Sequence, residues 1–114
     1  MKTMLHHGTI SDIFPALGDP TRRAILEQLE LGPLAVSDVA KPFDSTMPTV
    51  LYHLKVLESC GLVSSDKPGR VRTYSLNIHG FERLSYWFDR RRARAESAFN
   101  RTDENAVKLS GLNR

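Results

Sequence analysis

A change of hydrophobic spacing after Gly61 limits the folds open to this chain. Up to that glycine, apolar residues recur every three or four positions, as they do on one face of an α-helix. Two short runs that favour β-strands follow, 62–66 and 71–76, and a Pro-Gly turn signal lies between them. Helical spacing returns from Asn77. The sequence therefore predicts a mostly α-helical fold with one β-hairpin.

Four helices are predicted before the hairpin. The first covers residues 9–17, and the second starts after Asp19, whose carboxylate can accept the free amide hydrogens of a first helical turn. A short third helix is expected over about 36–42. The fourth is expected from about Met47 to Ser59, with Thr46 as its cap.

The long final helix sets the predicted domain limits. It begins at Asn77, and the sequence becomes polar beyond about Asn100. We therefore predict one domain over residues 1–100 and a flexible tail over 101–114. No apolar run approaches the roughly 20 residues of a membrane span, and the first residues lack the apolar segment of a secretory signal. A cytoplasmic protein without membrane association is expected.

The predicted order of elements, three helices, a fourth helix, a hairpin and a last helix, is that of a winged helix-turn-helix. The major groove of B-DNA admits one α-helix, and each base pair presents a distinct pattern of donors and acceptors there. The predicted fourth helix suits this role because its apolar and polar residues separate onto two sides. Its predicted DNA-binding residues, with those of the hairpin, are Thr46, Pro48, Thr49, Tyr52, His53, Lys55, Lys67, Arg70 and Arg72.

Each of these residues also has a purely structural interpretation. Tyr52 and His53 can be the solvated side of an amphipathic helix, and Thr46 and Thr49 can serve as local caps. The distribution of charge favours the DNA interpretation. Residues 1–44 carry four basic and six acidic side chains, whereas residues 79–114 carry eight basic and five acidic ones. A protein that presents one face to a polyanion is expected to show such asymmetry.

The apolar residues at the two ends of the domain exceed what a small domain of this layout can cover. We therefore predict a homodimer, which would place two recognition helices in successive major grooves of a palindromic operator, about 34–36 Å apart. The predicted dimer interface consists of Ile10, Ile13, Phe14, Phe81, Leu84, Trp87 and Phe88.

Several blocks of this sequence resemble the ArsR-type repressors. They include Asp-Pro-Thr-Arg-Arg at 19–23 and His-Leu-Lys-Val-Leu-Glu at 53–58, and the resemblance covers roughly residues 9–90. It implies a dimeric bacterial repressor whose first and last helices form the subunit interface. In metal-sensing members, ligands lie at the start of the third helix or along the last helix. Here residues 34–38 contain no cysteine, and the last helix lacks paired histidines. The chain thus resembles the branch without a metal site, so neither a metal nor a cofactor is predicted.

Two alternatives stay open beside this autorepressor hypothesis. In the first, Cys60 or a pocket at the interface makes DNA binding responsive to a thiol oxidant or a small ligand. In the second, the winged helix binds a protein instead of DNA. The sequence identifies no inducer, and no base-activated nucleophile, paired carboxylates or glycine-rich phosphate loop indicates an enzyme. Arg22 and Arg23 are expected to make surface salt bridges with Glu27 and nearby acids.

Overall fold

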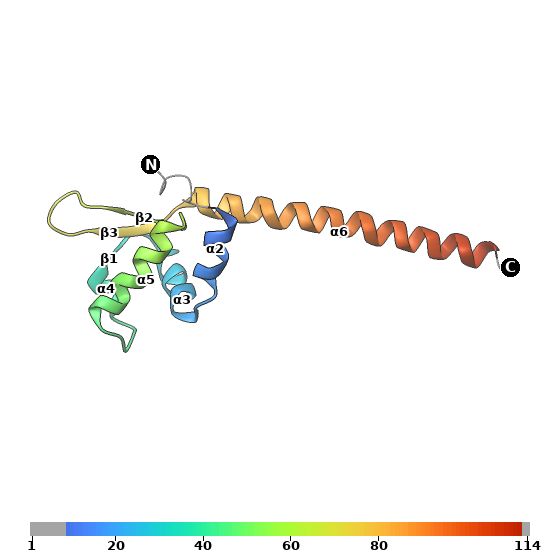
Figure 1. Cartoon of the computed structure of the whole chain (residues 1–114). Coiled ribbons are helices and arrows are strands. Elements are labelled where there is room, and N and C mark those ends of the chain that lie inside the picture. The colour runs from blue at the N-terminus through green and yellow to red at the C-terminus, as the bar shows by residue number, and fades with distance from the viewer. Residues whose placement is uncertain (1–8, 113–114) are drawn as a thin grey trace. The chain divides into compact units, whose positions relative to one another are not determined.

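A computed structural model describes the backbone of residues 9–112 and the side chains of residues 9–103. The chain divides into two units, which meet between Leu84 and Ser85. The helices of the first unit are α2 (Ile10–Leu17), α3 (Pro20–Leu29), α4 (Val36–Ala40) and α5 (Met47–Ser59) (Figure 1). Its strands are β1 (Leu34–Ala35), β2 (Val63–Asp66) and β3 (Thr73–Leu76). The last helix, α6, runs from Ile78 to Leu112 and supplies residues to both units.

Side-chain caps begin two of the helices where the sequence predicts them. The Asp19 carboxylate accepts the backbone N–H of Arg22 at 3.0 Å, which satisfies an otherwise unpaired donor in the first turn of α3. The Thr46 hydroxyl accepts the backbone N–H of Thr49 at 3.4 Å in the same way at the start of α5. After α5, Gly61 has a φ of 86°, a left-handed conformation that glycine adopts without a steric penalty.

The sheet has three antiparallel strands in the order β1-β3-β2. The predicted hairpin is confirmed as β2 and β3, with Val63 opposite Leu76 and Asp66 opposite Thr73. The strand β1 was not predicted. It pairs Leu34 with Tyr74, and its two residues are too few to show the alternation by which a strand is recognised in a sequence.

The hydrophobic core of the first unit is built from residues of α2, α3, α4 and α5 and from the sheet, with Phe81 and Leu84 of α6 packed against it. The side chains of α5 that face the core are Val50, Leu54 and Leu57, which make up the apolar side that the sequence predicts for this helix, and each has 0% exposure. Burial of these three residues fixes the rotation of α5 about its own axis, because helical residues three and four apart share one face. The opposite side of α5 is thereby held outward.

The helix α6 is longer than the sequence predicts. Residues 101–112, which we expected to belong to a flexible tail, continue α6 as helix. This stretch contains no proline, and alanine, leucine and lysine in it are strong helix formers. The domain limits themselves stay a prediction, and residues 1–8 and 113–114 lie outside the described residues. Neither α6 nor any other helix in the described part of the chain is apolar enough to cross a membrane.

Candidate nucleic-acid interface

The outward side of α5 carries the residues that the sequence pattern assigns to DNA binding. Tyr52 is 61% exposed, and Pro48 and Lys55 are also exposed. His53 is half-buried. These side chains alternate with the buried ones at helical spacing, so α5 presents its polar residues outward, beside the 41%-exposed Met47 and Leu51, while its other side is fixed in the core. A helix in this arrangement can enter a major groove without giving up core contacts.

Thr46 and Thr49 have a local structural role. Besides capping the backbone of α5, Thr46 shares a hydrogen bond between its hydroxyl oxygen and that of Thr49 at 2.9 Å. Both residues are exposed. The prediction that the two threonines act as local caps is therefore confirmed for Thr46. Any contact of Thr46 or Thr49 with DNA would use hydroxyl groups that already orient each other.

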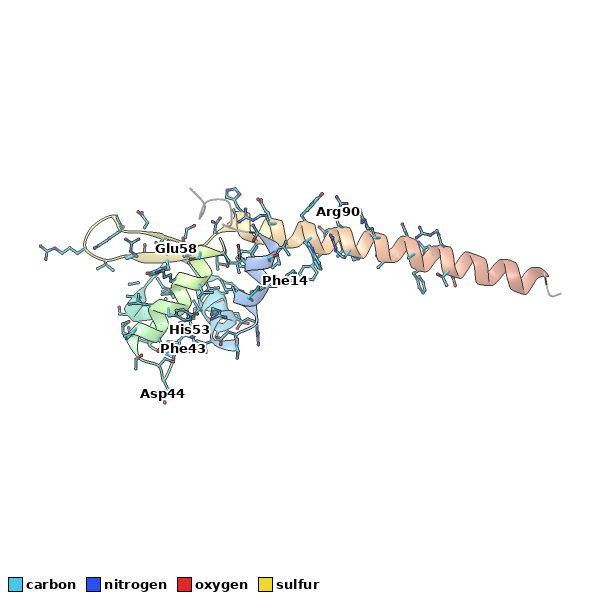
Figure 2. All side chains as sticks on the ribbon, in the orientation of Figure 1. Phe14, Phe43, Asp44, His53, Glu58 and Arg90 are labelled. Atoms are coloured by element: carbon cyan, nitrogen blue, oxygen red, sulfur yellow. The ribbon has the colours of Figure 1, made fainter. Side chains whose placement is uncertain are left out.

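His53 on α5, which is labelled in Figure 2, is oriented by Arg22 on α3. The guanidinium Nη1 of Arg22 lies 3.2 Å from Nδ1 of His53. Because arginine can only donate, Nδ1 must accept, and the ring proton then resides on Nε2. In this arrangement, Nε2 is the atom of His53 left to donate a hydrogen bond to a nucleic acid. The ring of Tyr52 lies 5.8 Å away, centroid to centroid, at an angle of 57°.

Arg22 connects three helices, a role that sequence reasoning missed. Its Nε donates to the carbonyl of Ala16 at 2.8 Å, and its Nη2 donates to the carbonyl of Pro15 at 3.2 Å. Both carbonyls belong to the last turn of α2, and that of Pro15 also accepts the backbone N–H of Gly18 at 3.1 Å. The expected salt bridge with Glu27 is therefore wrong for Arg22, because its guanidinium is directed to these carbonyls and to His53.

Asp19 completes the same junction between α2, α3 and α5. The hydrogen bond from the backbone N–H of Arg22 stabilises the carboxylate and holds the pKa of Asp19 below its ordinary value, and the charge of the nearby Arg22 guanidinium acts in the same direction. Arg23 makes a simpler contact, from Nη1 to the carbonyl of Leu17 at 2.7 Å, and here too the expected acidic partner is replaced by a backbone oxygen.

The hairpin residues of the predicted site fall into two groups. Arg72 donates from Nη1 to the Ser65 hydroxyl at 2.9 Å, and that hydroxyl donates to the carboxylate of Glu58 at 2.6 Å. This chain of contacts ties the hairpin to the end of α5. Lys67 and Arg70 are both exposed in the loop between the two strands. The loop thus presents two cations beyond the anchored base of the hairpin.

The predicted dimer residues differ in how much surface they can offer. Ile13 is fully buried in the core of its own chain, so it can only support an interface from beneath. In the first unit, Phe14 is 37% exposed, and the half-buried residues of the set are Ile10, Phe81 and Leu84. In the second unit, Phe88 is 50% exposed and packs edge-on against the half-buried Trp87, with ring centroids 5.4 Å apart.

Cys60 is buried, with 2% exposure, and its thiol lies 3.3 Å from the carbonyl of Leu57. Burial raises the pKa of the thiol, since the thiolate would lose its hydration. The thiolate is the reactive form of cysteine. The surroundings of Cys60 therefore argue against the alternative hypothesis of a thiol sensor.

Cys60 is expected to resist a thiol-reactive chromogenic disulfide as long as the protein is folded. The reagent should label less than one tenth as fast in buffer as in denaturant, because the buried thiol has neither access nor thiolate character. Absorbance followed over time with and without denaturant measures the two rates. Equal rates in both solutions contradict the burial argument and restore the thiol-sensor hypothesis.

Three of the acidic or histidine residues on α6 have partners within the helix. His79 Nδ1 lies 3.2 Å from the carboxylate of Glu82, and Asp89 accepts from Arg92 at 2.8 Å. In the described part of the chain, no three histidine, cysteine, aspartate or glutamate side chains come together as a metal site would need.

Comparisons with known proteins identify the same unit. A family model described as a helix-turn-helix domain matches residues 17–66. The chain is 42% identical to the HTH-type transcriptional regulator Rv2034 of Mycobacterium tuberculosis, over 74% of this chain and 78% of that protein. It is 35% identical to the transcriptional repressor SdpR of Bacillus subtilis, over 60% of this chain and 76% of that protein.

Solved structures agree with this similarity. The crystal structure of the ArsR family transcriptional regulator RHA00566 matches with a TM-score of 0.72 and 40% identity, over 76% of this chain and 96% of that one. The solution structure of Mb0332 from Mycobacterium bovis is described as a homodimeric winged helix-turn-helix DNA-binding domain. It matches with a TM-score of 0.58 and 25% identity, over 76% of this chain and 78% of that one.

Proposed function

Because this chain belongs to the ArsR family of helix-turn-helix transcriptional regulators, we propose that it is a cytoplasmic homodimeric repressor of a palindromic operator and not an enzyme. The observation that carries this proposal is the two-sided structure of α5. Val50, Leu54 and Leu57 are fully buried, while Tyr52 and Lys55 on the other side are exposed. A recognition helix needs this division between a fixed side and a readable side.

The proposed assignment of DNA contacts follows the geometry of the site. Tyr52, together with Nε2 of His53, is proposed to contact base edges, and Lys67 and Arg70 in the hairpin loop are proposed to contact phosphates. Arg72 is proposed to position the hairpin through Ser65, with a phosphate contact as its second role. Thr46, Pro48, Thr49 and Lys55 line the edge of the same surface.

The proposed dimer uses the ends of the domain. Phe14 and Phe88 keep a third or more of their surface exposed, at 37% and 50%, although both are large apolar residues. The remaining residues of the proposed interface are Ile10, Phe81, Leu84 and Trp87, with Ile13 beneath them. The similarity to the homodimeric Mb0332 domain supports the same assembly. Two-fold symmetry then implies half-sites about one helical turn of DNA apart.

A fluorescence anisotropy titration tests this function. The probes are a duplex from upstream of the gene for this protein and a scrambled duplex of equal length, each with and without zinc. We expect tight binding of two protomers to the upstream duplex, at least a thousandfold preference over the scrambled one, and no effect of zinc. Release of the upstream duplex on addition of zinc contradicts the proposal that DNA binding is independent of metal. Absence of any preference contradicts autorepression and favours the protein-binding alternative.

Variants of the loop and of α5 are expected to fail in different ways. Arg70→Ala should weaken binding to both duplexes and reduce the slope of log K against log salt by about 0.9 for each phosphate that the protein no longer neutralises. Tyr52→Ala should cost about 1–3 kcal/mol on the upstream duplex and much less on the scrambled one. Both are measured in the same titration over a series of salt concentrations.

Arg23→Ala is the matched control for the loop variant, since it also removes one exposed cation but contacts only the carbonyl of Leu17. It should leave the slope unchanged. If Tyr52→Ala weakens both duplexes equally, then Tyr52 does not read bases and the orientation proposed for α5 is wrong.

A further inference from the structure

The second unit carries an arginine-rich surface that the proposed operator contacts do not use. Residues 85–103 hold five arginines and three carboxylates. With about 3.6 residues per turn, Arg90, Arg94 and Arg101 fall within about 40° of one another around α6. The carboxylates recur every seven residues, at Asp89, Glu96 and Asp103, and lie about 100° or more from Arg90. The charges of this helix are therefore separated onto different sides.

The spacing of these arginines does not stabilise the helix. Arg90 and Arg94 are four residues apart, and Arg91 and Arg94 are three apart, which are the spacings at which like charges repel on a helix surface. Arg92 differs, because it donates to the carboxylate of Asp89 at 2.8 Å. Arg92 thus has an ion-pair partner within the helix. The grouping of Arg90, Arg91 and Arg94 instead favours the binding of an anion from outside the chain.

Aromatic side chains hold two of the guanidinium groups in place. Arg90 donates from Nη1 to the hydroxyl of Tyr86 at 2.8 Å, and its guanidinium carbon lies 5.6 Å from the centre of that ring (Figure 2). The guanidinium of Arg91 lies 4.5 Å from the centre of the Trp87 ring. Contacts of this kind orient a cation without neutralising it, and they leave further N–H groups for another acceptor.

Small side chains leave space beside the other two arginines. Arg94 and Arg101 line one open depression of the helix surface, together with Ala93 and Ser97. Both arginines are exposed. An oxyanion can approach between the two guanidinium groups here, and the planar guanidinium is well suited to paired hydrogen bonds with phosphate oxygens.

We propose that Arg90, Arg94 and Arg101 form a second DNA-binding surface, which contacts phosphates of the duplex outside the base pairs read by α5. From Arg90 to Arg94 and from Arg94 to Arg101 the helix rises about 6 Å and about 10 Å, so the surface presents several cations along a line to a polyanion. This inference rests on the proposed function, because operator binding tethers the chain to duplex DNA.

The matched variants Arg94→Ala and Arg92→Ala test the second surface in the full chain. Each removes one arginine from the same exposed helix, and alanine keeps the helix formed. Affinity is measured over a series of salt concentrations, with the upstream duplex and with the scrambled duplex, and the double variant Arg90→Ala/Arg94→Ala enlarges the effect. Sedimentation of the free proteins reports their oligomeric state.

We expect Arg94→Ala, but not Arg92→Ala, to weaken binding to both duplexes and to lower the salt slope. A dimer of the double variant that neutralises four fewer phosphates should have a slope smaller by about 3.6, while its preference for the upstream duplex is unchanged. If the wild-type protein does not prefer the upstream duplex but the double variant still has a lower salt slope, the proposed operator recognition is wrong and the second DNA-binding surface is supported.

Two outcomes overturn the inference while leaving operator binding intact. In one, the wild-type protein prefers the upstream duplex, but the salt slopes of Arg94→Ala and of the double variant are equal to that of Arg92→Ala. In the other, the slope is unchanged but the double variant alters the oligomeric state. The arginines would then bind the carboxylates of a second copy of α6 instead of DNA.

Discussion

Gly80→Ala is expected to destabilise the first unit by about 2–3 kcal/mol. An ideal Cβ at residue 80 would lie 2.1 Å from the carbonyl oxygen of Gly61 and 3.2 Å from Cα of Leu62. Both neighbours are backbone atoms, so the clash cannot be relieved by a change of rotamer. Overpacking typically costs about 1–3 kcal/mol and occasionally more. A Cβ this close to a backbone oxygen forces the backbone to move, so we expect a cost of about 3–4 kcal/mol, of which the better helix propensity of alanine offsets about 1 kcal/mol.

The close contact at Gly80 is part of how α6 begins. The backbone N–H of Asn77 donates to the carbonyl of Leu62 at 2.9 Å, one residue before the helix starts. Gly80 itself is buried. A shift of α6 away from Gly61 would lengthen this hydrogen bond and open the end of the core, so the strain cannot be relieved without cost elsewhere.

Thermal unfolding at a fixed protein concentration measures the effect. A loss of 2–3 kcal/mol corresponds to a decrease in Tm of about 10–20 °C for a domain of this size. Gly69→Ala is the matched control, since no atom lies within 4 Å of the Cβ that it would add. A Tm of Gly80→Ala equal to that of wild type or of the control contradicts the packing of α6 against Gly61.

The elements with strong local signals could be predicted from the sequence. Asp19 and Thr46 mark the starts of α3 and α5 because a cap requires only a side-chain oxygen within one helical turn of its partner. The buried side of α5 follows from spacing alone, since core residues of a helix repeat every three to four positions. These predictions depend on contacts between residues close together in the chain.

The features that could not be predicted depend on tertiary structure. The acceptors of Arg22 are carbonyls of Pro15 and Ala16 and the ring of His53, which come together only after α2, α3 and α5 have packed. Backbone acceptors carry no sequence signal, whereas the charge of Glu27 is visible in the sequence and favours a salt bridge with Arg22. Gly80 gives no signal either, because a glycine near a helix start is compatible with open space as well as with a backbone neighbour.

The contacts of Arg22 predict a second large effect. Arg22→Ala is expected to lower the free energy of unfolding by about 2–3 kcal/mol, because two carbonyls at the end of α2 and one ring nitrogen on α5 lose a charged donor together. Urea unfolding of the variant measures this change. Arg23→Ala, which removes a single contact at an exposed position, should cost less than about 1 kcal/mol.

Arg22→Ala is also expected to weaken binding of the upstream duplex about tenfold, while binding of the scrambled duplex and the salt slope stay as in wild type. His53 loses the donor that fixes its ring, so Nε2 no longer has one preferred direction toward the groove. Arg22→Lys separates this positioning role from a phosphate contact, because lysine keeps the charge but cannot reach three acceptors with a planar fork. Two results would contradict the positioning role: full affinity of Arg22→Lys for the upstream duplex, or a salt slope of Arg22→Ala that is lower by about 0.9 per protomer. Either result would mean that Arg22 acts as a cation at the DNA backbone. Its connection of α2 to α5 would then not be what supports recognition.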